Sequence, residues 1–262
     1  GSDGKPTGSW FPTTVNHPDL IPAISPFWNA AVGLSENYPS IIGYCMWNEP
    51  SYGGIYSCPT QFADYSKWGI DAFKAWAKST YSDIKTANQK WHTSFESFDT
   101  IAPPKEPTDN NRVFWYEWIK FGQQSFAGFF ANERKYILSK YPGTLLNIKK
   151  QGNPFESDAA ASGTNYVLMG KTEDFFGLNT YGGAVTYRNT LDWCRAFAGN
   201  KPVVIFETNV MPPNAEGRTL ERVRTSLWSL VLGGAHGIFL FCYDPDPAHG
   251  FTNDAAVSPK VR

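Results

Sequence analysis

The chain has 262 residues and a formal net charge of -1, because 23 lysines and arginines are offset by 24 aspartates and glutamates. This balance, with no basic stripe, speaks against a nucleic-acid partner, and the length suits one α/β barrel-sized domain. No apolar run of about 18 residues is present, so we expect no membrane span. The amino terminus shows no basic start followed by an apolar stretch, as a signal peptide would, and the compartment stays open.

Short apolar runs bounded by breakers predict strands buried on both faces, and helix-like apolar spacing separates most of them. In chain order, the pattern predicts a helix at 24–36, a strand at 41–47, helices at 62–80 and 115–138, strands at 144–149, 174–181 and 202–207, a helix at 220–232 and a strand at 237–243. Pro142-Gly143 and Gly233-Gly234 stop the helices that precede them.

Strands that alternate with helices pair in parallel through right-handed crossovers, which predicts a (β/α)8 barrel. A closed barrel needs eight strands, whereas five are indicated here. We therefore expect residues 1–262 to form one catalytic barrel domain that carries strands 4 to 8. The first three β/α units and the last helix would be absent or supplied separately. The expected protein partner is either this missing barrel segment or a second copy of the chain in a homo-oligomer.

Two glutamates stand where a predicted strand ends: Glu49 follows the strand at 41–47, and Glu207 ends the strand at 202–207. In a β/α barrel the carboxyl ends of the strands form the rim where active sites assemble. Two carboxylates facing each other across a pocket are what glycoside hydrolysis requires. Met46, Trp47 and Pro50 give Glu49 apolar surroundings that suit a protonated acid.

Asn48 and Tyr181 lie beside these glutamates in the predicted rim. The amide of Asn48 can donate to a sugar hydroxyl, although Asn48-Glu49-Pro50 can equally cap a strand and open a turn. The phenol of Tyr181 can donate to a carboxylate, which favours its charged form and so a nucleophile. The alternative for Tyr181 is an ordinary half-buried tyrosine.

The four cysteines, at positions 45, 58, 194 and 242, show no CxxC spacing and no clustered histidine partners. We therefore expect no metal site and no cofactor. Aromatic residues make up 16% of the chain, and their flat rings suit both core packing and stacking on sugars.

The chain resembles the clan A glycoside hydrolases, and most closely the family 42 β-galactosidases. The resemblance rests on residues 55–62, on 73–81, on the Asn88, Trp91 and Phe95 pattern, and on Pro103-Pro104. It implies that Glu49 is the general acid/base, Glu207 the nucleophile, Asn48 a sugar-hydroxyl partner and Tyr181 the residue that orients the nucleophile. The zinc-binding cysteine cluster of the family is reduced to Cys58, which removes the metal.

The expected function is therefore a retaining glycosidase that cleaves terminal β-galactosides or related β-glycosides with two glutamates. A clan A hydrolase of β-glucans, mannans or algal galactans is one alternative, and a sugar-binding relative without catalysis is another. The substrate-binding residues we expect are Trp47, Asn48, Trp91, Asn179, Tyr181 and Tyr243.

Overall fold

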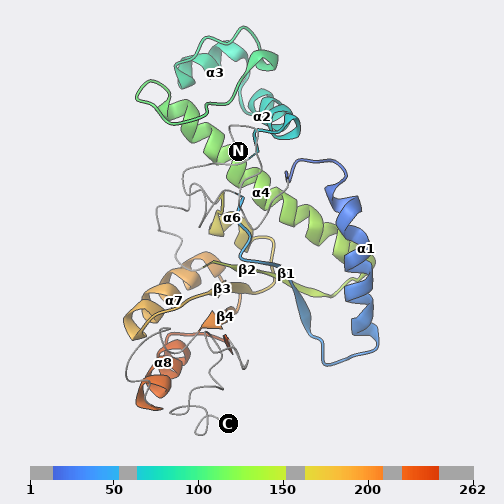
Figure 1. Ribbon diagram of the computed structural model, residues 1–262, viewed down its shortest axis with the longest axis vertical. Helices are drawn as coiled ribbons and strands as arrows, with labels where there is room; N and C mark the ends of the chain where they lie inside the picture. The colour runs from blue at the N-terminus through green and yellow to red at the C-terminus, as the bar shows by residue number, and fades with distance from the viewer. Residues whose placement is uncertain (1–13, 53–63, 152–162, 209–219, 242–262) are drawn as a thin grey trace. The chain divides into compact units, whose positions relative to one another are not determined.

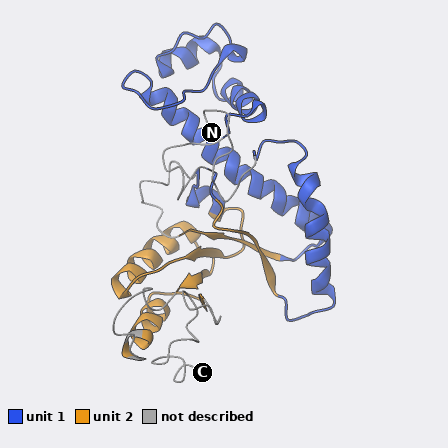
Figure 2. Ribbon diagram, viewed as in Figure 1, with its two compact units in different colours: residues 1–41, 51–144, 155–169 blue, residues 42–50, 145–154, 170–262 orange. Residues whose placement is uncertain are grey.

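The computed structural model describes residues 14–52, 64–151, 163–208 and 220–241. The chain divides into two compact units, drawn in blue and orange in Figure 2. Unit 1 comprises residues 1–41, 51–144 and 155–169, and unit 2 comprises residues 42–50, 145–154 and 170–262. In the sequence, most of unit 1 is inserted between the first and second strands of unit 2.

Unit 2 is built on a parallel sheet of five strands in the order β1-β2-β3-β4-β5, of which Figure 1 labels the first four. The strands are β1 (Gly43–Asn48), β2 (Leu145–Lys150), β3 (Phe176–Asn179), β4 (Val203–Thr208) and β5 (Gly237–Leu240). Each coincides with a predicted strand to within a few residues. Strand order equals chain order because every connection crosses over to the next neighbour.

Helices α7 (Ala184–Ala198) and α8 (Leu220–Leu232) belong to the same unit, and α7 packs against β3, β4 and α8. Apolar side chains of the sheet, such as Leu178, Val203 and Ile205, are almost fully buried. The fold class is therefore α/β, and the prediction of five strands of a β/α barrel is confirmed. The sequence pattern missed α7, whose Val185, Thr186 and Thr190 are β-branched and lower its helix propensity.

The strand register shifts near the carboxyl ends in three of the four pairings. The shifts fall between Cys45 and Asn48, between Leu178 and Asn179, and between Ile205 and Thr208. Such bulges re-aim the side chains that follow them and are frequent beside active sites. Here they fall next to both predicted catalytic glutamates.

Unit 1 is helical, and its long helix α4 (Arg112–Lys140) extends the predicted helix at both ends. The other elements are α1 (Leu20–Gly33), η1 (Leu34–Glu36), α2 (Lys67–Thr80), α3 (Ile84–Trp91), η2 (Phe98–Thr100) and the short α6 (Tyr166–Gly170), whose last residue falls in unit 2. Helix α2 begins later than predicted because the Ser66 side chain caps it, accepting the Gly69 N–H at 3.1 Å. No helix in the described part of the chain is long and apolar enough to cross a membrane.

Aromatic side chains make up the core of unit 1. Phe73 lies at its centre, with ring centroids 4.9 Å from Trp118 and 6.0 Å from Trp91. The first pair is edge-on and the second stacked, and ring pairs of both kinds add stabilisation beyond the area they bury. Much of the aromatic content therefore serves packing.

Candidate active site at the carboxyl ends of the strands

The carboxyl ends of β1 to β4 bring the two predicted catalytic glutamates to one edge of the sheet. The Glu49 N–H donates to the Lys149 carbonyl at 2.7 Å, and the Thr180 N–H donates to the Glu207 carbonyl at 2.9 Å. Asn179 is the register partner of Glu207 on the neighbouring strand. Backbone pairing therefore fixes both glutamates at the same end of unit 2.

Both carboxylate oxygens of Glu207 have a partner. Lys149 forms an ion pair with Oε1, and the Tyr181 hydroxyl donates to Oε2. The Lys149 and Glu207 side chains are only 17% and 13% exposed, so solvent screens their attraction weakly. One oxygen of Glu207 therefore faces a positive charge, and the other accepts a hydrogen bond from a phenol.

Glu49 has a different environment. It is 8% exposed, and its Oε1 accepts a hydrogen bond from the Asn179 side-chain amide at 2.5 Å. Burial has the largest effect on the pKa of Glu49 and raises it. The Asn179 hydrogen bond lowers the pKa, the charge of Glu207 raises it, and the charge of Lys149 lowers it. Glu49 is thus the carboxyl of the pair that retains its proton to higher pH than an ordinary glutamate.

The backbone at Glu49 is also unusual, because its φ angle is +45°. A residue with a Cβ seldom adopts this left-handed conformation, and such strain is concentrated at functional sites. The chain bends at Glu49, directly after β1.

Asn179 contacts a carboxylate, whereas we expected it to bind sugar. It is 1% exposed and its amide nitrogen is engaged by Glu49. Its Oδ1 is buried without a hydrogen-bond partner among the described residues. The side chain thus has almost no accessible surface, and its observed contact is with the predicted acid.

The remaining predicted substrate-binding residues divide into three groups. Asn48 is exposed and Trp47 partly buried at the end of β1, and Tyr181 is 41% exposed while it holds Glu207. Trp91 was predicted wrongly: it is fully buried in the core of unit 1 and donates to the Tyr81 hydroxyl at 3.1 Å, so its ring has no surface for a sugar. Tyr243 lies outside the described residues.

Lys149 on β2 is a site residue whose position only the structure decides. Alternation along β2 could have buried or exposed it, and only its contact with Glu207 places it in the site. Asn147, two residues earlier, is fully buried, and its side-chain nitrogen would lie 2.4 Å from a Cβ placed on Gly177. Glycine at position 177 therefore lets the Asn147 side chain lie against β3 beneath the site.

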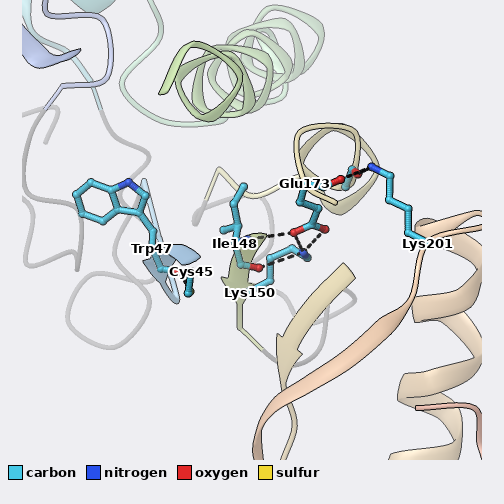
Figure 3. Close-up of polar contacts among 7 residues, drawn as sticks. Cys45, Trp47, Ile148, Lys150, Glu173 and Lys201 are labelled. Atoms are coloured by element: carbon cyan, nitrogen blue, oxygen red, sulfur yellow. Dashed lines mark hydrogen bonds and ion pairs between the residues drawn. The ribbon is translucent and has the colours of Figure 1, made fainter. Parts of the chain in front are cut away.

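The next residue of β2, Lys150, belongs to a buried ion pair (Figure 3). Its ammonium lies 2.5 Å and 2.7 Å from the two carboxylate oxygens of Glu173, which also accepts the Ile148 N–H at 3.1 Å. Lys201 donates to the Glu173 carbonyl at 2.5 Å. Burial lowers the pKa of Lys150 and raises that of Glu173, and the attraction within the pair opposes both shifts. This cluster anchors β2 and the segment before β3, which supports the strand ends that carry the site.

Among the described residues, no three histidine, cysteine, aspartate or glutamate side chains gather in a group that could hold a metal ion. Cys58, the one cysteine that the resemblance placed in the zinc cluster, lies outside these residues.

Residues 13–249 match the sequence profile of the β-galactosidase family of glycoside hydrolases, family 42. No curated protein matches the chain in sequence.

Solved structures share the fold at low sequence identity. The β-galactosidase of the psychrophilic Marinomonas ef1 has a TM-score of 0.76 at 15% identity, over 95% of this chain and 41% of its own. The apo exo-carrageenase of Bacteroides ovatus, also of family 42, has a TM-score of 0.77 at 17% identity, over 96% and 38%. The β-galactosidase of Bacillus circulans sp. alkalophilus has a TM-score of 0.73 at 17% identity, over 91% and 37%. The chain thus spans about two fifths of the length of these structures.

Proposed function

Because this chain belongs to glycoside hydrolase family 42, we propose that it carries the catalytic pair of a retaining β-galactosidase. Glu49 is the general acid/base and Glu207 the nucleophile. The substrate is a terminal β-galactoside or a related β-glycoside.

The observation that carries this proposal is the difference between the two carboxyl environments. Glu207 has a cation and a phenol on its oxygens, whereas Glu49 is buried, accepts from a neutral amide and has a raised pKa. Two carboxyls whose environments differ in this direction take different roles: the ionised one attacks and the protonated one donates.

In the first step, a Glu207 oxygen bonds to the anomeric carbon while the bond to the leaving oxygen breaks. Glu49 transfers its proton to that oxygen and becomes a carboxylate. In the second step, Glu49 removes a proton from water, and the resulting oxygen displaces Glu207 from the sugar. The anomeric configuration is inverted twice and so retained.

A hydrolase of algal galactans is the second candidate. It is supported by the similarity to the exo-carrageenase, whose TM-score of 0.77 and identity of 17% are close to the 0.76 and 15% of the Marinomonas β-galactosidase. Both candidates use the same pair of glutamates and differ in the groups that surround the sugar.

The first test is hydrolysis of a panel of nitrophenyl β-glycosides and carrageenan oligosaccharides by the full chain. We expect release from β-galactosides or from the galactans, and loss on the order of 10⁴-fold in kcat for Glu207→Gln. Glu96→Gln, at an exposed position of unit 1, is the matched control and should keep full activity. Sugar binding without hydrolysis of any substrate would instead favour a non-catalytic sugar-binding protein.

Azide separates the two roles. In Glu207→Ala, azide replaces the missing nucleophile and should give the α-glycosyl azide. In Glu49→Ala, azide attacks the glycosyl-enzyme and should give the β-glycosyl azide. The opposite assignment of products would exchange the roles of the two glutamates.

A further inference from the structure

Lys149 is connected to both members of the catalytic pair. Its backbone carbonyl accepts the Glu49 N–H at 2.7 Å, and its ammonium pairs with Glu207 Oε1. It is the fifth residue of β2, between the strands that carry or adjoin the two glutamates. A displacement of this residue would therefore affect both carboxyls.

We propose that Lys149 is a positioning residue that supplies one positive charge to Glu207 before the sugar is attacked and to Glu49 afterwards. This inference rests on the proposed function. It goes beyond it because nothing in a double displacement requires a lysine on β2.

The balance of charge explains why one cation suffices. In the free site, Glu207 is the anion and Glu49 holds a proton. When Glu207 forms its bond to the anomeric carbon, it becomes a neutral ester, and Glu49 becomes the anion as its proton leaves with the departing oxygen. The site carries one negative charge in both states, and the ammonium of Lys149 stabilises each carboxylate in turn.

The ammonium of Lys149 is suited to this exchange. It is a compact point charge on a flexible stem, so it can follow the negative charge over a short distance. At 17% exposure it is shielded from most solvent, which strengthens the attraction. The charge of Lys149 already acts on Glu49 in the free site, because it lowers the pKa of Glu49 against the larger effect of burial.

Within the part of the chain that the structure describes, the groups that face Glu49 come from three strands and the segment that follows one of them. They are Lys149 on β2, Asn179 on β3, Glu207 on β4, and Tyr181, which reaches Glu49 only through Glu207. Lys149 is the one cation among these four. Without Lys149, burial and the charge of Glu207 would still raise the pKa of Glu49. Of these groups, only the Asn179 hydrogen bond would then oppose the shift.

The test compares Lys149→Met, which keeps the length and removes the charge, with Lys149→Arg, which keeps the charge. For Lys149→Met we expect kcat to fall roughly 10- to 100-fold. KM should change little, and the basic limb of the kcat/KM profile should move to higher pH. Lys149→Arg should restore the limb toward its original position. Lys171→Met, at an exposed position of unit 2, is the matched control and should leave the profile unchanged.

A purely structural role for Lys149 would give a different result. The melting temperature of Lys149→Met would fall, Lys149→Arg would not restore the rate, and the pH profile would not move. That combination overturns the inference.

A second readout does not depend on turnover. The titration of the Glu49 side chain can be followed by carbon NMR in protein labelled at glutamate, with Glu49→Gln to assign the signal. Its midpoint should rise in Lys149→Met, and a midpoint equal to that of the unmodified chain would refute the role of Lys149. If no glycoside reacts, the proposed function is wrong, but the NMR titration still tests whether Lys149 acts on Glu49.

Discussion

The side-chain amide of Asn179 lies 2.5 Å from the carboxylate of Glu49, although the two residues are 130 positions apart in the chain. Both side chains are at most 8% exposed. The hydrogen bond lowers the pKa of Glu49, while burial, the larger effect, raises it. Asn179 therefore limits the rise in the pKa of Glu49 that burial causes.

Replacing Asn179 by alanine should move the basic limb of the kcat/KM profile to higher pH. The hydrogen bond stabilises the charged form of Glu49, so its loss raises the pKa and the acid keeps its proton longer. We also expect the rate at the optimum to fall roughly 10-fold, because Glu49 loses the group that orients it. Asn37→Ala, at an exposed position of unit 1, serves as the control. A limb that stays in place or moves to lower pH would contradict this role.

Tyr181→Phe removes the hydroxyl that donates to Glu207 Oε2 and keeps the ring. A hydrogen bond to a charged group contributes about 1.5–3 kcal/mol, so kcat should fall roughly 10- to 100-fold. Steady-state kinetics measure the effect, and Tyr116→Phe, whose side chain is 61% exposed, provides a comparison. Equal activity of the two variants would mean that the phenol does not act on the nucleophile.

Glu49→Gln should stabilise the protein at neutral pH while it removes activity. The folded-state pKa of Glu49 is raised, so the folded chain holds a proton that the unfolded chain releases, and stability falls as pH rises through this range. Glutamine does not titrate, so the variant avoids this loss of stability at higher pH. It keeps an oxygen that can accept from Asn179.

Thermal unfolding at two pH values checks the sign. The melting temperature of Glu49→Gln should exceed that of the unmodified chain at about pH 8, and the two should converge near about pH 4, where glutamates protonate in either state. Glu96→Gln should show no such pH-dependent difference. A variant that is less stable than the parent at about pH 8 would show that the charge of Glu49 is favourable in the fold.

Replacing only one partner of the buried Lys150–Glu173 ion pair should strongly lower the free energy of unfolding. Lys150→Met or Glu173→Gln leaves the other charge fully buried without its partner, which costs about 3–5 kcal/mol. The double variant Lys150→Met with Glu173→Gln should lose less than the sum of the two single variants, since no charge remains buried. Denaturant unfolding of the full chain gives these values, and strict additivity would mean that the two residues act independently.

The positions of the strands and of both glutamates follow from local sequence. A short apolar run bounded by breakers forms a strand wherever it is buried, and a residue directly after it reaches the strand end. This is why Glu49 and Glu207 could be predicted at the rim, and why Tyr181 could be predicted beside a carboxylate. The helices α3 and α7 were missed because one is only eight residues long and the other is rich in β-branched residues.

Trp91 shows the limit of local reasoning. Its place in a polar stretch of sequence gives no sign that Phe73 and Phe114 close over it with ring centroids 6.0 Å and 5.0 Å away. Whether an aromatic ring lines a site or fills a core depends on which helices pack against it, and this is decided by contacts between distant segments.

Which residues end each strand follows from the local pattern of side chains, because strand formation depends on neighbouring residues. The partners of the two carboxyls, in contrast, depend on how distant strands come together. The Lys149 and Glu207 side chains meet across 58 positions and those of Asn179 and Glu49 across 130. Such contacts depend on the register between strands and on the bulges that shift it, which no local pattern encodes.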